Sequence, residues 1–432
     1  MYFIYNLLLL LLSPALWSYY LFQKAVQGKY REGLRERLGD LRDYGLAGSG
    51  STIWLHAVSV GEVHAAAPLV KALKGHLKGT RIVVSTVTET GRRTAEKHLK
   101  EADRLFYFPL DYPWVVRSVL DTIRPDIYLS METELWPNLL RELGRRGVPA
   151  LLVNGRISPR SFRGYLCVKP FMRGVLSKVS AFSMQSEADA RRIVSLGAEP
   201  GRVKVTGNLK FDGTPALLDG ERRRSLLKEL GLAEGRPTIL AGSTHRGEEE
   251  WVGEAFLRLR EKYPSLLLIL APRRPERVPE VKSLLAARGL EVRLRTQAAP
   301  PGEHPPVLLV DTVGELPSLY SLARVAFVGG SLVAAGGQNA LEPAAQRVPV
   351  IFGPHMENFS EVARLLRESG ACIQLAGPEG LFAAFESLLQ NPQEAAAMGE
   401  RGARVVEEHR GAVEKNLKLI VGSLLALRKE PG

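Results

Sequence analysis

Residues 53–70 read IWLHAVSVGEVHAAAPLV, and this stretch contains the pattern that decides the fold. The run from Ile53 to Val58 is apolar and rich in β-branched residues, as expected of a buried strand. An alanine-rich segment follows it after a short turn, and Glu62 is the acidic side chain in that turn. A strand followed by a turn and a helix predicts the first part of a βαβ unit.

The same alternation of strand and helix continues along the chain and predicts an α/β fold with mostly parallel sheets. Five strands precede a Gly- and Pro-containing crossing near residues 208–220, and five follow it. The ten predicted strands cover residues 52–59, 81–88, 126–131, 149–154, 181–186, 237–243, 265–272, 307–312, 325–330 and 348–353. We therefore predict two doubly wound, Rossmann-like domains, residues 50–212 and 213–432. They should face a cleft lined by the carboxyl ends of their strands.

The N-terminal segment from Met1 to Phe22 contains no charged side chain and is long enough to cross a bilayer. It lacks the basic start and small-residue cleavage site of a signal peptide. Residues 1–23 are therefore predicted to form a membrane anchor, with an apolar helix lying in the interface as the alternative. Residues 24–49 are predicted to be a basic segment on the cytoplasmic side. Its cations include Lys24, Lys29, Arg31, Arg35 and Arg37.

Composition and missing motifs restrict the chemistry. The 432-residue chain has a net charge of +12, which favours an anionic partner such as nucleic acid, a membrane surface or an acidic substrate. Its two cysteines are too few for a disulfide framework or a Cys-rich zinc site. No P-loop, dinucleotide fingerprint, nucleophile elbow or HExxH motif is present. Because Asp-x-Asp is also missing, a sugar transferase built on this chain would stabilise its leaving phosphate with cations and helix dipoles.

Three loops in the second half could bind an anion. The segment after residues 325–330 has a glycine pair that allows close backbone approach, followed by polar residues that could open a helix and expose free amides. A Pro-flanked arginine pair could hold a phosphate, although a solvated basic turn is an equal alternative. A third strand ends in Ser-Thr-His, with three glutamates that suit a helix start. The residues concerned are Gly336, Gly337, Gln338, Asn339, Glu342, Arg273, Arg274, Ser243, Thr244 and His245.

Polar side chains also follow two strands of the first half. Glu132 and Glu134 come directly after residues 126–131, and Asn154 and Arg156 follow the next strand. These clusters point to the same edge of the predicted sheet. Considered alone, Glu62 reads as a residue that complements a helix dipole rather than as a base.

Ten segments, in order, resemble those of the bacterial Kdo transferases, which move 3-deoxy-D-manno-octulosonic acid (Kdo) from CMP-Kdo to the lipid A precursor. They are VSVGEV (58–63), METELWPN (131–138), NGRIS (154–158), QSEADARRIVSLGA (185–198), GNLKFD (207–212), GSTHRGEE (242–249), APRRPERV (271–278), FVGGSL (327–332), GGQNALEPA (336–344) and FGPHMENF (352–359). The resemblance extends to about residue 365. It implies a GT-B fold, inversion at the anomeric carbon and work on the cytoplasmic leaflet of the bacterial inner membrane.

The resemblance also implies residue roles. The glutamate of the family's Gly-Glu segment is the general base and falls on Glu62, and the acidic strand-end motif falls on Glu132 and Glu134. The nucleotide site falls on Arg273, Gly337, Asn339 and Glu342, with Lys210 reaching in from the crossing. The expected partners are CMP-Kdo, lipid IV(A) and the anionic surface of the membrane, with no cofactor, no metal and no nucleic acid.

Three alternative functions remain open at this point. A sugar-nucleotide epimerase has the same two-domain fold and would release free sugar from UDP-GlcNAc. A membrane-tethered nucleic-acid binder is suggested by charge alone and lacks a recognisable binding module. A GT-B transferase could also use another nucleotide sugar.

Overall fold

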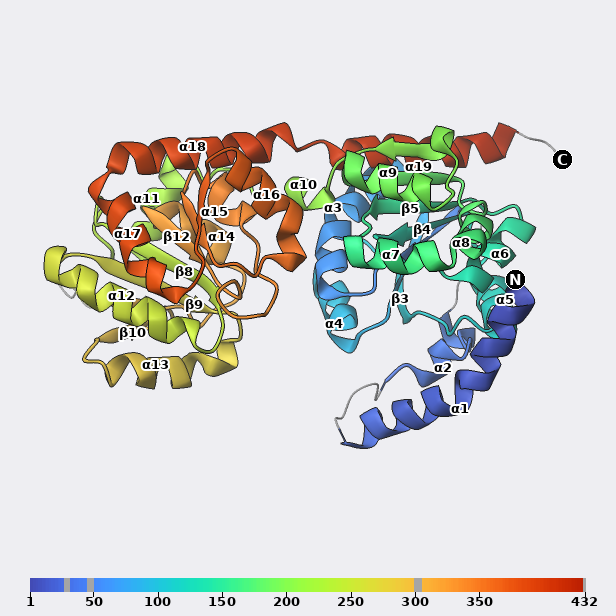
Figure 1. The fold of residues 1–432 in the computed structure, drawn as a ribbon, viewed down its shortest axis with the longest axis horizontal. Coiled ribbons are helices and arrows are strands. Elements are labelled where there is room, and N and C mark those ends of the chain that lie inside the picture. Colours follow the sequence, from blue (N-terminus) through green and yellow to red (C-terminus); the bar gives the residue numbers. More distant parts are fainter. Residues whose placement is uncertain (27–31, 45–49, 299–304, 430–432) are drawn as a thin grey trace. The chain divides into compact units, whose positions relative to one another are not determined.

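The computed structural model describes residues 1–26, 32–44, 50–298 and 305–429. The chain divides into two compact units, which we describe separately. The first contains Met1–Gly213 and His409–Gly432, and the second contains Thr214–Glu408. Each unit has a seven-stranded sheet in which every recorded strand pair is parallel, with helices on both faces (Figure 1). The predicted α/β class with parallel sheets is confirmed.

The sheet of the first unit has the order β3-β2-β1-β4-β5-β6-β7. Its strands are β1 (Thr52–His56), β2 (Arg81–Thr86), β3 (Arg104–Tyr107), β4 (Ile127–Met131), β5 (Ala150–Gly155), β6 (Ala181–Met184) and β7 (Val203–Val205). Alternate side chains of β1 enter two different cores. Trp54 packs in the core on one face of the sheet, whereas Ile53 and Leu55 pack in the core on the other. Burial on both faces explains the continuous apolar run in the sequence.

The helices of the first unit connect these strands and cover both cores. They are α1 (Tyr2–Val26), α2 (Leu34–Arg37), α3 (Val60–His76), α4 (Glu89–His98), α5 (Pro113–Ile123), α6 (Pro137–Arg145), α7 (Pro159–Cys167), α8 (Lys169–Leu176), α9 (Glu187–Ser195), α10 (Leu209–Asp212) and α19 (Ala412–Lys429). The C-terminal helix α19 packs on α3 and α10. Asp212 holds its start, because the carboxylate accepts hydrogen bonds from the backbone N–H groups of Gly411 (2.8 Å) and Val413 (3.1 Å).

The sheet of the second unit has the order β10-β11-β9-β8-β12-β13-β14. Its strands are β8 (Thr238–Thr244), β9 (Leu267–Pro272), β10 (Val292–Leu294), β11 (Val307–Leu309), β12 (Val325–Val328), β13 (Val350–Phe352) and β14 (Cys372–Gln374). Its helices are α11 (Gly220–Glu229), α12 (Glu248–Lys262), α13 (Val278–Ala286), α14 (Leu316–Leu319), α15 (Leu341–Ala345), α16 (Ser360–Glu368), α17 (Leu381–Gln390) and α18 (Pro392–Glu408).

The N-terminal helix differs from the prediction. Within the part of the chain that the structure describes, no helix is long and apolar enough to cross a membrane. The span predicted over residues 1–23 is therefore not found.

Helix α1 packs against the first unit through polar and aromatic side chains. The Tyr5 hydroxyl donates to Asp111 (3.0 Å), the Ser13 and Tyr112 hydroxyls lie 2.5 Å apart, and the Asn138 amide donates to Asn6 (2.6 Å). Tyr5 also stacks on a ring of α8. These contacts explain why a segment without charges still has one polar face.

The predicted basic segment also needs a correction. Lys29 and Arg31 lie outside the described residues, as does the side chain of Lys24. Arg37 does not face a membrane surface, because it is buried. Its guanidinium donates to the Val87 carbonyl (2.5 Å) and lies 4.6 Å from the centre of the Tyr107 ring. Arg37 therefore has a structural role, whereas Arg35 is exposed.

Candidate active site

The predicted acidic residues of the first unit lie at the point where the strand order of its sheet reverses. Strands β1 and β4 are neighbours there, because the chain passes from β1 to β2 and β3 on one side before it returns to β4 on the other. Glu62 lies in the first turn of α3, directly after β1, and Glu132 follows β4. Ligands of doubly wound sheets bind at this kind of position.

Glu62 is buried, with 8% of its surface exposed. Its carboxylate accepts hydrogen bonds from the Val58 backbone N–H (2.9 Å) and the Ser59 hydroxyl (3.0 Å). Burial and, to a smaller extent, the negative charges of Glu132 and Glu134 together raise the pKa of Glu62 to about 7, although the two hydrogen bonds oppose the rise. The residue thus braces the start of α3 and, near neutral pH, has a pKa suited to a general base.

Glu132 has a left-handed backbone, with φ of 53°. A side chain with a Cβ is strained in this region, and such strain gathers at functional sites. The loop that holds it is braced by side chains, since the Ser130 hydroxyl donates to the Glu134 carbonyl (2.6 Å) and the Thr133 hydroxyl donates to the Arg156 carbonyl. Burial raises the pKa of Glu134 as well.

Aromatic packing lies beneath this acidic cluster. The ring of His56 stacks on Phe108 at a centroid distance of 3.8 Å, and Phe108 in turn contacts Trp136 at 5.0 Å. Burial lowers the pKa of His56 to about 3, so the imidazole is neutral. His56 therefore serves packing, and its neutral ring brings no positive charge near Glu62.

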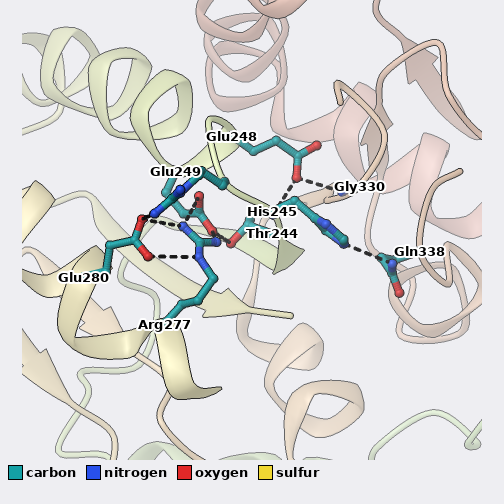
Figure 2. A network of polar contacts seen from close by, with 9 residues as sticks. Thr244, His245, Glu248, Glu249, Arg277, Glu280, Gly330 and Gln338 are labelled. Carbon is teal, nitrogen blue, oxygen red and sulfur yellow. Dashed lines mark hydrogen bonds and ion pairs between the residues drawn. The ribbon is translucent and has the colours of Figure 1, made fainter. Parts of the chain in front are cut away.

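In the second unit, one buried glutamate joins the two loops at the reversal of strand order between β8 and β12 (Figure 2). Glu248 is fully buried, and its carboxylate accepts four backbone N–H groups. They belong to His245 (2.8 Å), Gly330 (2.7 Å), Ser331 (3.0 Å) and Leu332 (3.0 Å). The three glutamates were predicted to suit the start of α12, and they do occupy its first turn. Nothing in the sequence pattern indicates that Glu248 holds together two loops that are about eighty residues apart.

Thr244 and its partners form a second layer of this network (Figure 2). The Thr244 hydroxyl is buried and donates to Glu249 (3.0 Å), whose carboxylate also pairs with Arg277 (2.7 Å). Any predicted contact of Thr244 with substrate would therefore use its backbone. Ser243 precedes it with a left-handed backbone, φ 55°, at the end of β8.

His245 connects the β8 loop to the glycine-pair loop. Its Nε2 lies 3.3 Å from the amide nitrogen of Gln338. Burial lowers the pKa of His245, and the neighbouring charges of Arg273 and Arg274 lower it further. A neutral imidazole can accept a hydrogen bond from the Gln338 amide, which agrees with this contact. Arg273 itself is fixed through its backbone N–H, which donates to the Thr244 carbonyl (2.9 Å).

The glycine pair has the geometry that the sequence predicts. Gly336 and Gly337 have φ of 84° and 76°. An added Cβ would lie 2.4 Å from the Asn358 side chain at Gly336 and 2.4 Å from the Met356 sulfur at Gly337, so larger residues do not fit. The helix after the pair is short. It begins at Leu341 and ends at Ala345, so its dipole supplies only a weak anion site.

Asn339 and Glu342 nevertheless form a polar pair beside Arg273. The Asn339 amide donates to Glu342 (3.1 Å), and its carbonyl oxygen accepts from the Leu341 backbone N–H (3.2 Å). Burial raises the pKa of Glu342 to about 7, while Asn339 and the charge of Arg273 oppose the rise. The structure thus brings His245, Gln338, Asn339, Glu342 and Arg273 together in one unit.

Lys210 lies in the other unit, on the short helix α10. The Asn208 side chain accepts the backbone N–H of Lys210 (3.0 Å), and Asn154 accepts that of Leu209 (3.0 Å). Asn154 also has a left-handed backbone, φ 56°, at the end of β5. Residues of the predicted first-half cluster therefore hold the turn that carries Lys210, and its approach to nucleotide stays a prediction.

Known proteins resemble this chain in sequence and in fold. The family profile of the 3-deoxy-D-manno-octulosonic-acid transferase (kdotransferase) matches residues 32–213. The 3-deoxy-D-manno-octulosonic acid transferase of Haemophilus influenzae is 35% identical over 427 residues, which cover 97% of this chain and 97% of that protein. The enzyme of the same name from Bordetella pertussis is 34% identical over 429 residues, covering 96% and 97%.

Two solved structures resemble the fold at low sequence identity. The UDP-GlcNAc 2-epimerase of Neisseria meningitidis has a TM-score of 0.57 and 14% identity, covering 87% of this chain and 100% of that one. A glycosyltransferase from Rickettsia africae has a TM-score of 0.57 and 13% identity, covering 87% and 99%. These values show that the two parallel-sheet units resemble GT-B glycosyltransferases, as predicted, and they do not separate transferase from epimerase. The full-length sequence relatives do, and the chain therefore belongs to the 3-deoxy-D-manno-octulosonic acid transferase family of glycosyltransferases.

Proposed function

We propose that the protein transfers Kdo from CMP-Kdo to lipid IV(A), with inversion at the anomeric carbon and without a metal ion. The observation that carries the proposal is Glu62, a buried carboxylate with a pKa of about 7 at the strand-order reversal of the first sheet. The identity of the transferred sugar is inferred from the names of the relatives.

Glu62 would act on the acceptor. A hydroxyl of the lipid sugar must lose its proton as its oxygen attacks the ketosidic carbon of Kdo, and an ionised Glu62 within hydrogen-bond reach can accept that proton. Glu132 and Glu134 would keep the base poised, because their negative charges raise its affinity for a proton. Direct attack from the face opposite the departing CMP inverts the configuration of that carbon.

The second unit would bind the donor. The Arg273 guanidinium can hold the CMP phosphate and stabilise the charge that it gains on departure. Glu342, supported by Asn339, can accept hydrogen bonds from ribose hydroxyls, and Gly337 lets the loop before it pack closely against Met356. Lys210 would contribute a second cation. The missing Asp-x-Asp motif supports stabilisation by these cations rather than by a carboxylate-held metal.

We also propose that the enzyme works at the cytoplasmic face of the inner membrane, where α1 lies in the plane of the interface. The support is the set of exposed apolar side chains on this helix, which includes Phe3 at 78% and Leu11 at 68% exposure. The others in the first half of α1 are Ile4, Leu7, Leu8, Leu10 and Leu12. A helix with one polar, docked face and one apolar, exposed face is typical of interfacial attachment.

Mass spectrometry of the lipid product tests the transfer directly. Purified protein is incubated with CMP-Kdo and lipid IV(A) in neutral detergent, with EDTA in a parallel reaction. We expect a mass increase of one or more Kdo residues, equal in both reactions. Free sugar released from UDP-GlcNAc, with no lipid product from CMP-Kdo, would favour the epimerase alternative and contradict the proposal.

A further inference from the structure

The segment that follows β5 has an unusual charge pattern. From Arg156 to Ser186 the sequence has six basic residues and no acidic one. The basic residues are Arg156, Arg160, Arg163, Lys169, Arg173 and Lys178. The segment contains α7 and α8, and none of the side chains of α7 is fully buried. A surface with one sign of charge attracts anions.

Four of these cations are exposed, and the part of the chain that the structure describes gives them no carboxylate partner. Arg160, Arg163, Lys169 and Arg173 are exposed, and none of them takes part in an ion pair recorded among the described residues. The neighbouring helix α6 differs, because its Glu142 pairs with Arg117, Arg145 and Arg146. Cations without internal partners remain available to a ligand.

Helix α7 lies next to the acidic cluster of the candidate active site. The Thr133 hydroxyl, between Glu132 and Glu134 in the sequence, donates to the Arg156 carbonyl just before α7. On α7 itself, burial raises the pKa of the Tyr165 phenol, and the charge of the nearby Glu134 raises it further. A ligand held by the outer face of α7 would therefore lie near the residues that we propose act on the acceptor.

Helix α8 connects this basic surface to the apolar helix α1. Phe171 stacks on Tyr5 at a centroid distance of 5.7 Å and meets Tyr2 edge-on at 6.0 Å. Leu166 and Val168 are exposed at the junction of α7 and α8. Cations and exposed apolar side chains thus occur together, which matches the chemistry of a lipid with a phosphorylated head group.

We propose that the outer face of α7 and α8, above all Arg160 and Arg163, binds a phosphate group on the sugar head of the lipid acceptor. This inference rests on the proposed function, since the acceptor is taken to be a phosphorylated lipid. The contact of α7 with the acidic cluster favours the substrate over the bulk phospholipid, because a site for membrane attachment alone need not lie beside Glu134.

The test compares two double variants with two acceptors in neutral detergent. Arg160→Gln/Arg163→Gln removes the proposed site. Arg222→Gln/Arg224→Gln on α11 removes two exposed cations elsewhere and is the matched control. The acceptors are lipid IV(A) and the same lipid after phosphatase treatment.

For the first variant we expect the KM for lipid IV(A) to rise roughly ten- to a hundredfold, the scale of losing charge-assisted hydrogen bonds. The kcat and the KM for CMP-Kdo should stay unchanged. With the dephosphorylated lipid, the variant and the wild type should have the same KM, because the variant lacks only the phosphate contact. The control variant should behave as wild type with both lipids.

Two results would overturn the inference. An unchanged KM for lipid IV(A), with weaker binding to phosphatidylglycerol vesicles, would assign the cations to bulk phospholipid. An equal rise in KM for both lipids would indicate general damage to the acceptor site.

If the wild type transferred no Kdo at all, the proposed function would fail independently of this inference. Direct binding of lipid IV(A) to wild type and variant, measured without donor, would then still decide the inference.

Discussion

Two glutamates occupy equivalent places in the two units, yet their surroundings differ. Glu62 lies in the first turn of α3 after β1, and Glu248 lies in the first turn of α12 after β8. Both strands border the reversal of strand order in their sheet. Glu248 accepts four backbone N–H groups. Glu62 accepts two hydrogen bonds and lies near two other carboxylates.

The difference shows how one position can serve either structure or chemistry. Four donors occupy the lone pairs of Glu248, so this residue organises the loops around it. Glu62 has spare acceptor capacity, and burial beside Glu132 makes its charged form less favourable. Such a carboxylate is stabilised when it takes up a proton, which is the property that a general base needs.

The largest effect is expected when Glu248, the structural glutamate of the pair, is replaced. Glu248→Ala leaves four buried N–H groups without an acceptor, and we expect a loss of about 3–5 kcal/mol in the unfolding free energy of the second unit. Binding of CMP should weaken with it. Chemical unfolding followed by intrinsic fluorescence measures the change. Glu250→Ala, an exposed residue of the same turn, is the control, and equal stability of the two variants would contradict the assigned role.

Replacement of Glu62, the proposed general base, should show the opposite result, with activity lost and stability kept. Glu62→Gln retains the shape and can still accept a hydrogen bond from Val58, but an amide does not accept the proton of the attacking hydroxyl. We expect kcat to fall roughly a hundredfold or more, with an unchanged melting temperature. Ser59→Ala, which removes one partner of Glu62 and leaves its carboxylate, is the control. Near-normal turnover by a folded Glu62→Gln protein would exclude the general base.

A smaller effect is expected for single residues of the donor site. Arg273→Ala removes a phosphate fork and Glu342→Ala removes a ribose acceptor, so each should weaken CMP binding by about tenfold. Isothermal titration calorimetry measures both, with Arg222→Ala as a control on an exposed helix of the same unit. Unchanged affinity in both variants would mean that the nucleotide binds elsewhere.

The central strands could be predicted from the sequence, but the edge strands could not. The ten predicted strands include every inner strand of both sheets. The four that were missed are β3, β7, β10 and β14, which are the edges. Their residues are partly exposed, with the pattern iee along β7 and iie along β14. A short strand covered on one face has no continuous apolar run to distinguish it from a loop.

Two other differences have the same origin, because they depend on partners far away in the chain. The uncharged segment at the N-terminus predicts a span, but its polar face contacts Asp111 and Asn138. Likewise, Glu62 and Glu248 both read as residues that suit a helix start. The proposed base differs from the loop brace in its surroundings, because the charge of Glu132 acts on Glu62, whereas Glu248 accepts hydrogen bonds from residues 330–332.

The smallest predicted effect tests the electrostatic part of the comparison. In the proposed mechanism ionised Glu62 is the active form, so kcat/KM should fall as the pH drops through about 7. Glu132→Gln removes a negative neighbour that helps to raise this pKa, so the pKa should fall and the acid limb should move to lower pH by roughly half a unit to one unit.

The control is Glu199→Gln, on the surface of the same unit, which should leave the acid limb in place. Profiles of kcat/KM between pH 5 and 9 measure the shift of the acid limb. A limb that stays unmoved, or moves to higher pH, would show that Glu132 does not set the proton affinity of Glu62.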